Sequence, residues 1–232
     1  ALPIWKLCSF NCIYCECGLN ENHRTRSKLP TRAEVKEALI HKLSSMQAEG
    51  VAPDVITFAG NGEPTMHPEF AGIIDDTIET RNRFFPKAKI AVLSNSTMLY
   101  KEDVFQALNK IEDNILKLDS ISDSRIGQLN VPNSPAFTFD RLLEQLCRFN
   151  GNLIIQTMFL KGEVNGESVT NTTEHEISGW LEALKQIKPK QVMIYTIDRE
   201  TPVKNLKKVT KDELEAIADR ARQEGFEVMV SA

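Results

Sequence analysis

Short apolar segments alternate with longer amphipathic segments along most of the chain. The apolar segments are rich in β-branched residues and stop at glycine or polar residues, as buried strands do. They lie at 54–60, 88–95, 114–120, 152–160, 191–197 and 226–231, and 2–6 is typical of the end of an earlier strand. Helical periodicity occupies 31–50, 68–84, 101–111, 138–149, 174–187 and 210–225. Thr31 and Gly50 are suited to begin and end the first of these helices.

Strict alternation of strands and helices predicts parallel strands joined by right-handed crossovers. The chain has six such units, fewer than the eight that close a full barrel. We therefore expect an α/β fold, a partial (β/α)6 TIM-type barrel with its active site at the strand carboxyl ends. An open doubly wound sheet is the alternative. We expect residues 1–232 to form a single core domain, and the short first strand suggests that N-terminal residues are lacking.

Three polar segments that follow strands are long, at 121–137, 161–173 and 198–209. Most of the returns from helix to strand are short. Because these segments leave the carboxyl ends of strands, where parallel α/β folds carry their chemistry, we expect them to be mobile loops that cover the site.

Composition is that of an ordinary soluble globular protein, with 41% hydrophobic and 26% charged residues among 232. No apolar run is long enough to span a membrane, and the N-terminal segment lacks the pattern of a secretory signal. We therefore expect a cytoplasmic protein without a membrane partner. The net charge of −4 argues against a protein that coats nucleic acid. Basic stretches at 23–28 and 204–208 leave an anionic or RNA substrate open.

Four of the five cysteines lie between positions 8 and 17, and Cys147 alone lies elsewhere, in a predicted helix. This distribution does not fit a disulfide framework and favours a reduced, metal-binding group. Cys8, Cys12 and Cys15 have the spacing C-x3-C-x2-C within "CSFNCIYC". A [4Fe–4S] cubane accepts thiolates from one loop, and three thiolates leave its fourth iron open.

Two alternatives to an open cluster remain. A zinc-stabilised binding module would need four ligands, with Cys17 or His23 as the fourth. A fully ligated iron–sulfur electron carrier would use Cys17 as its fourth thiolate.

The second predicted strand ends in the sequence "GNGEP" at 60–64. Glycines at positions 60 and 62 let the backbone approach a ligand closely, and Glu63 can accept hydrogen bonds from an ammonium group. A turn that merely joins strand to helix is the alternative. The motif therefore suits the amino group of a ligand held at the open iron.

The cysteine motif, with Tyr14 as its aromatic residue, and the "GNGEP" turn that begins forty-five residues after Cys15 together resemble the radical S-adenosylmethionine superfamily. The stretches "CIYCE", "KLDS" and "QTMFLKG" are similar to those of iron–sulfur oxidoreductases related to wyosine-type tRNA-modifying synthases. The resemblance implies a [4Fe–4S] cluster on Cys8, Cys12 and Cys15 whose open iron is chelated by S-adenosylmethionine. One electron, from an external donor such as flavodoxin or ferredoxin, would yield a 5′-deoxyadenosyl radical that abstracts hydrogen from an unidentified substrate.

The same resemblance assigns cofactor contacts at the strand ends. Those residues are Tyr14, Gly60, Asn61, Gly62, Glu63, Pro64, Ser94, Asn95, Gln156 and Tyr195. Lys117 and Asp119 are polar residues within an apolar strand and share one of its faces by two-residue alternation. They are candidates for catalytic residues acting on the substrate, and a structural ion pair between them is the alternative.

Overall fold

The computed structural model describes residues 6–20, 29–59 and 61–232. Its main sheet has six parallel strands in the order β1-β2-β3-β4-β7-β9. The strands are β1 (Val55–Phe58), β2 (Lys89–Ser94), β3 (Asp113–Lys117), β4 (Ile154–Met158), β7 (Gln191–Tyr195) and β9 (Val228–Ser231). Each coincides with an apolar segment predicted from the sequence. Most of the first strand, expected at 2–6, lies outside the described residues, as do Gly60 and His23.

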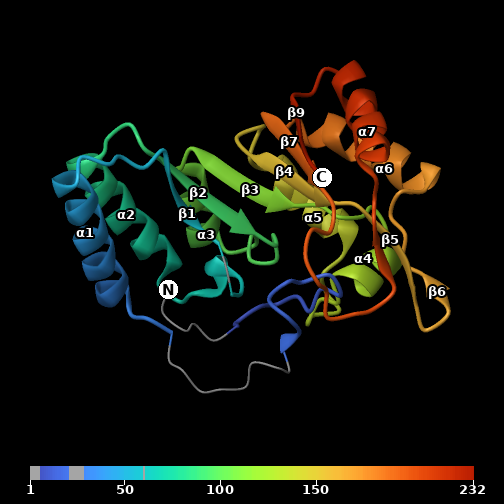
Figure 1. Cartoon of the computed structure of the whole chain (residues 1–232), viewed down its shortest axis with the longest axis horizontal. Coiled ribbons are helices and arrows are strands. Elements are labelled where there is room, and N and C mark those ends of the chain that lie inside the picture. The colour runs from blue at the N-terminus through green and yellow to red at the C-terminus, as the bar shows by residue number, and fades with distance from the viewer. Residues whose placement is uncertain (1–5, 21–28, 60) are drawn as a thin grey trace.

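Six of the described helices lie in the ranges predicted from the sequence, and a seventh, at Asp123–Leu129, does not. They are α1 (Arg32–Ala48), α2 (Phe70–Phe84), α3 (Glu102–Asn109), α4 (Asp123–Leu129), α5 (Phe139–Cys147), α6 (Glu174–Ile187) and α7 (Lys211–Gln223), with a 3₁₀ turn η2 (Pro64–Met66). Thr31 caps α1 as expected, in a capping box with Glu34. Because adjacent strands are consecutive along the main sheet and parallel throughout, the prediction of a partial α/β barrel is confirmed (Figure 1).

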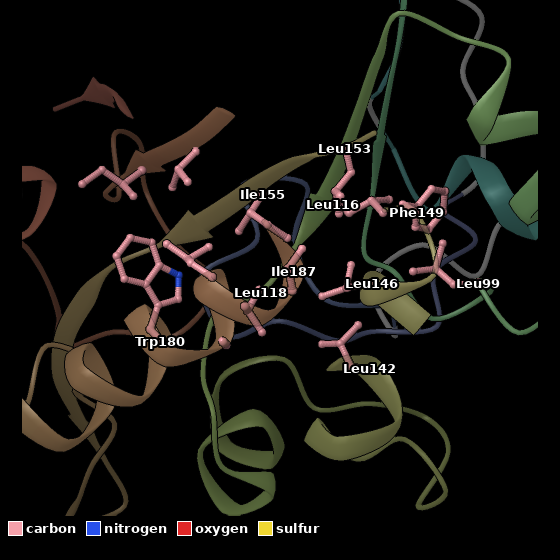
Figure 2. Close-up of a cluster of buried hydrophobic side chains, with 14 of the residues drawn as sticks. Leu99, Leu116, Leu118, Leu142, Leu146, Phe149, Leu153, Ile155, Trp180 and Ile187 are labelled. Carbon is pink, nitrogen blue, oxygen red and sulfur yellow. The ribbon is translucent and has the colours of Figure 1, made fainter. Parts of the chain in front are cut away.

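One face of the sheet packs against the helices and forms the main core. Leu116, Ile155 and Val192 alternate outward from β3, β4 and β7 and are fully buried. They meet apolar residues of the surrounding helices, among which Trp180 of α6 and Leu146 of α5 are prominent (Figure 2). This continuous layer fixes the positions of the strand ends.

The opposite face of the sheet forms the inside of the partial barrel. Ala91, Ile115 and Ile154 form a small buried cluster there, with Leu93 and Met193 packed against it. Lys117 and Gln156 stand in register on β3 and β4, one step nearer the carboxyl ends. The interior therefore changes from an apolar floor to polar side chains toward that end.

The three segments expected to be mobile loops contain secondary structure, so they are not irregular loops, whereas their mobility and their covering of the site stay predictions. Residues 161–173 belong to a hairpin of β5 (Leu160–Val164) and β6 (Glu167–Ser168), which pairs with β8 (Leu206–Lys208) from the segment 198–209. The segment 121–137 contains α4, whose N-cap Ser122 accepts from the backbone N–H of Arg125. In the described part of the chain, no helix has the length and apolar character needed to cross a bilayer.

Candidate functional site at the strand carboxyl ends

The cysteine segment is built into the carboxyl-terminal face of the sheet. Leu7 forms a parallel bridge with Gly62 beyond the end of β1, and its carbonyl accepts from the Glu63 N–H at 2.7 Å. On its other side, backbone N–H groups of Asn11 and Ile13 donate to carbonyls of residues 129–131 after α4, at 2.9–3.1 Å. The segment is therefore held between the β1 end and the α4 end.

Apolar packing anchors the same segment. Phe10, Cys12, Ile13 and Tyr14 are buried in a second apolar cluster together with Leu129, Met158, Leu160, Val169 and Ile197. Phe10 also packs edge-on against Phe137, with ring centroids 5.2 Å apart. This packing brings the three cysteines over the carboxyl ends of the strands, where the sequence predicts the site.

The three cysteine thiols differ in exposure. Cys12 is buried, whereas Cys8 and Cys15 are half-buried. Burial raises the pKa of the Cys12 thiol to about 12 and also raises the pKa of Cys8. A positively charged metal centre would be needed to hold such a thiol as the thiolate that binds metal.

The donor set, three cysteine thiols on one segment, fits an iron–sulfur cluster. In residues 6–20, 29–59 and 61–232, no three Cys, His, Asp or Glu side chains converge closely enough to bind one metal ion. Structural zinc requires four ligands that do so. A cubane is bound at its separate iron corners, so its cysteines need not converge on one point. The zinc alternative that uses His23 involves a residue outside the described ranges.

Glu63 occupies the turn after β1 and is 6% exposed. Its Oε1 accepts from the N–H and the hydroxyl of Thr65, at 3.1 and 2.5 Å, and from the Ser94 hydroxyl at 2.8 Å. Its Oε2 accepts from the Asn95 N–H at 2.6 Å. Burial raises the pKa of Glu63, although these hydrogen bonds oppose that effect. The carboxylate thus joins the ends of β1 and β2.

Asn95 links the same turn to the cysteine segment. Its side-chain Nδ2 lies 3.0 Å from Ser9 Oγ and 3.5 Å from Cys8 Sγ. Ser9 Oγ in turn lies 2.5 Å from Thr97 Oγ1. The structure therefore brings Glu63, Ser94 and Asn95 together, as the sequence predicts, beside Asn61, Gly62 and Pro64 of the turn.

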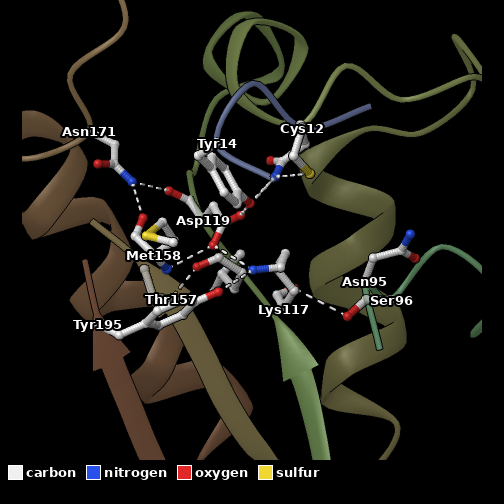
Figure 3. Close-up of polar contacts among 12 residues, drawn as sticks. Cys12, Tyr14, Asn95, Ser96, Lys117, Asp119, Thr157, Met158, Asn171 and Tyr195 are labelled. Carbon is white, nitrogen blue, oxygen red and sulfur yellow. Dashed lines mark hydrogen bonds and ion pairs between the residues drawn. The ribbon is translucent and has the colours of Figure 1, made fainter. Parts of the chain in front are cut away.

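A buried polar cluster surrounds Asp119, which follows β3 (Figure 3). The hydroxyl of Tyr14 donates to Oδ2, and Asn130 Nδ2 donates to the same oxygen at 2.7 Å. The N–H of Met158 donates to Oδ1 at 2.9 Å, and Lys117 Nζ lies 3.5 Å from Oδ1. Asp119 therefore accepts from the cysteine segment, the α4 end and strand β4 at once.

Lys117 lies at the centre of this cluster. Its Nζ donates to the Tyr195 hydroxyl at 2.9 Å and stands 5.4 Å from the ring centroids of both Tyr14 and Tyr195. Burial alone would lower the pKa of Lys117, but the charge of Asp119 raises it above its ordinary value. Asp119 and the Tyr195 hydroxyl therefore favour the charged form of Lys117.

The structure thus gathers the predicted residues into two connected groups, one around Glu63 and one around Asp119. Gln156 lies beside Lys117 in register, on the neighbouring strand. Sequence reasoning missed Lys6, Thr65 and Asn130. Asn130 lies in the segment expected to be a mobile loop, and its contacts with Tyr14 and Asp119 span 116 and 11 positions.

No family model matches the chain. The chain is 30% identical over 220 residues to a UPF0026 protein of Helicobacter pylori, covering 91% of this chain and 65% of that protein. It is 27% identical over 214 residues to a protein of Brachyspira hyodysenteriae named GTPase Obg, covering 90% of this chain and 29% of that protein. The chain therefore spans under two thirds of these relatives.

Solved structures resemble the whole described fold. Streptococcus suis SuiB, in a crystal structure bound to S-adenosylmethionine, matches with a TM-score of 0.69 at 15% identity, covering 98% of this chain and 48% of that chain. TYW1, in a structure with a lysine-pyruvate adduct bound, matches with a TM-score of 0.63 at 16% identity, covering 94% of this chain and 70% of that chain. The resemblance expected from the cysteine motif is confirmed at the level of the fold: the chain has the partial-barrel fold of these radical S-adenosylmethionine enzymes.

Proposed function

We propose that the chain is a radical S-adenosylmethionine enzyme with a [4Fe–4S] cluster on Cys8, Cys12 and Cys15. One observation carries the proposal. Three thiols on one segment lie over the strand carboxyl ends of a fold shared with SuiB, which was crystallised with S-adenosylmethionine. When bound, the cluster would supply one electron that cleaves S-adenosylmethionine and yields a radical able to abstract hydrogen from a substrate.

The residues of the chain would then do three things. The cysteine thiolates would hold the cluster. The turn at 61–64 would supply backbone groups close to the methionyl end of S-adenosylmethionine, with Glu63 keeping that turn in place. The inside of the barrel, from its apolar floor to Lys117 and Gln156, would hold the substrate away from water.

Several further parts of the proposal rest on the sequence resemblance. They are an external one-electron donor such as flavodoxin or ferredoxin, and cofactor contacts at Tyr14, Ser94, Asn95, Gln156 and Tyr195. The proposed cytoplasmic location rests instead on the pattern of the sequence. In the structure Tyr14 and Tyr195 flank Lys117, and Asn95 donates toward the cysteine segment. Any cofactor contact by these three side chains would add to bonds that they already make.

Anaerobic reconstitution tests the proposal. The wild-type protein should take up iron and sulfide, and Cys8→Ala, Cys12→Ala and Cys15→Ala should each lose most of that iron. Cys147→Ala is the matched control, because Cys147 lies at the end of α5, away from the cysteine segment, and should leave the iron content unchanged. Full iron retention in any of the three variants would contradict the assignment.

The response to S-adenosylmethionine separates an enzyme from an electron carrier. Adding S-adenosylmethionine to the reduced cluster should change its electron paramagnetic resonance spectrum and yield 5′-deoxyadenosine. A cluster fully ligated by Cys17 has no open iron, so its spectrum would not respond. Cys17→Ala should keep both the iron and the response.

A further inference from the structure

Each of the three cysteine sulfurs has one side-chain nitrogen donor beside it. The pairs are Lys6 Nζ with Cys15 Sγ at 3.3 Å, Asn95 Nδ2 with Cys8 Sγ at 3.5 Å, and Asn130 Nδ2 with Cys12 Sγ at 3.6 Å. All three donors are less than one-tenth exposed, at 5%, 8% and 2%. One buried donor for each sulfur is a regular arrangement that the cysteine motif alone does not require.

The donors reach the sulfurs from three separate parts of the fold. Lys6 precedes the cysteine segment, Asn95 follows β2, and Asn130 caps the end of α4. A neutral thiol is only a weak acceptor, whereas hydrogen bonds to a charged acceptor are about twice as strong. The arrangement therefore suits sulfurs that carry negative charge.

Lys6 gives the strongest indication of that charge. Its ammonium group is buried and contacts Cys15 Sγ and the carbonyl oxygen of Gly18. Across the described ranges no carboxylate lies within ion-pair distance of its Nζ. By contrast, the buried ammonium of Lys117 is paired with Asp119. Within the described residues the Lys6 ammonium contacts only a cysteine sulfur and a carbonyl oxygen, and this arrangement suits a sulfur that carries negative charge.

We propose that Lys6, Asn95 and Asn130 are positioning residues that donate to the three cluster thiolates, with Lys6 as the buried counter-charge of the cluster. This inference rests on the proposed function, because it requires the cluster to be held by Cys8, Cys12 and Cys15. Hydrogen bonds to the sulfurs and local charge set the potential of an iron–sulfur cluster. Because reduction adds negative charge, these donors favour the reduced cluster and make its reduction easier.

The proposed effect of these donors on the reduction potential is tested by redox titration of the reconstituted protein. The titration is monitored by electron paramagnetic resonance in the absence of S-adenosylmethionine. Lys6→Met should make reduction at least about tenfold less favourable, which is about 59 mV for one electron. Lys6→Arg should have a reduction potential close to that of wild type, because arginine keeps the positive charge and the N–H donors. Lys89→Met is the matched control: it removes the same charge at the amino end of β2, where Lys89 pairs with Asp113 at 3.4 Å. Equal midpoints in Lys6→Met and Lys89→Met would overturn the inference.

Urea unfolding of the cluster-free protein gives a second, independent readout. In that form no cluster charge lies beside the buried Lys6 ammonium, so replacing it with the apolar side chain in Lys6→Met should raise the unfolding midpoint. If Lys6 served only to hold the Gly18 carbonyl, the same variant would lower the midpoint, and the inference would fail. The comparison of unfolding midpoints between wild type and Lys6→Met tests the role of Lys6 even if Lys6→Met does not load the cluster.

The two proposals fail in different ways. A wild-type protein that takes up no iron and sulfide overturns the proposed function and this inference with it. A wild-type protein that loads the cluster, while Lys6→Met titrates like wild type, overturns only the role of Lys6.

Discussion

Replacing Glu63 by alanine separates two roles that the turn after β1 can have. The sequence motif assigns Glu63 to the amine of a ligand, and on that basis Glu63→Ala should weaken S-adenosylmethionine binding by about ten- to a hundredfold, or about 1.5–3 kcal/mol, and leave the fold unchanged. In the structure, however, the carboxylate already accepts four hydrogen bonds from Thr65, Ser94 and Asn95. We therefore expect Glu63→Ala to destabilise the cluster-free protein as well.

The size of that effect follows from the donors left behind. The hydroxyls of Thr65 and Ser94 can rotate toward other acceptors, but the backbone N–H groups of Thr65 and Asn95 cannot. Two buried N–H groups without acceptors cost about 1–3 kcal/mol each. Burial of the carboxylate, which raises the pKa of Glu63, costs free energy in the wild-type protein, and the variant no longer bears that cost. A net loss of about 2–4 kcal/mol remains.

Urea unfolding of the cluster-free protein measures this loss. With a slope of about 3 kcal/mol per molar urea, a loss of 3 kcal/mol lowers the midpoint by about 1 M. Glu63→Gln should lose less, because its amide oxygen can still accept from Thr65 and Ser94. Glu37→Ala, at an exposed position on α1, should stay within about 0.5 kcal/mol of wild type. If the unfolding midpoint of Glu63→Ala equals that of Glu37→Ala, the structural role is refuted and the ligand role is the one that remains.

The remaining predictions concern stability and its dependence on pH. Gly62→Ala should lower the free energy of unfolding by about 1–3 kcal/mol, because Gly62 has φ of +130° and a Cβ there would collide with the Leu7 carbonyl. Asp119→Leu should cost about 3–5 kcal/mol by the same measurement, because it leaves a buried ammonium without its partner. Asp76→Asn should have a lower free energy of unfolding than wild type near neutral pH. This difference in free energy should shrink as pH falls from 3.8 toward about 2. The reason is that hydrogen bonding to Arg32 lowers the pKa of Asp76 to about 2, so the stabilisation is lost only when that carboxylate is protonated. A difference that persists at pH 2 would contradict this assignment.

The regular part of the fold could be predicted because its signals are local. Apolar strands such as 114–120 and capped helices such as the one after Thr31 carry their pattern within ten to twenty residues. The hairpin of β5 and β6 also had a local signal that was overlooked. Asn165 and Gly166 both have positive φ, at 53° and 82°, and an Asn-Gly pair between strand residues is a strong indication of a two-residue hairpin turn.

The site could be predicted only in part, because its decisive contacts join distant positions. The cysteine spacing and the "GNGEP" turn are short motifs, so they point to chemistry without any knowledge of the fold. The donors Asn95 and Asn130 lie 87 and 118 positions from the sulfurs that they contact. No periodicity of the sequence reveals such pairs. A neutral asparagine in a polar segment gives no sign of its partner until the chain is folded.

Asp119 shows how the structure separates the two interpretations that the sequence left open for the Lys117–Asp119 pair. The Asp119 side chain has no exposed surface, and its oxygens accept from Tyr14, Asn130 and Met158 as well as facing Lys117. A carboxylate so enclosed cannot reach a substrate unless some of these bonds break, so its geometry favours the structural alternative. Lys117 retains 14% exposure of its side chain and faces the barrel interior between two tyrosine rings. Any contact of this pair with a substrate is therefore expected to come from Lys117, with Asp119 holding that ammonium group and the cysteine segment in one arrangement.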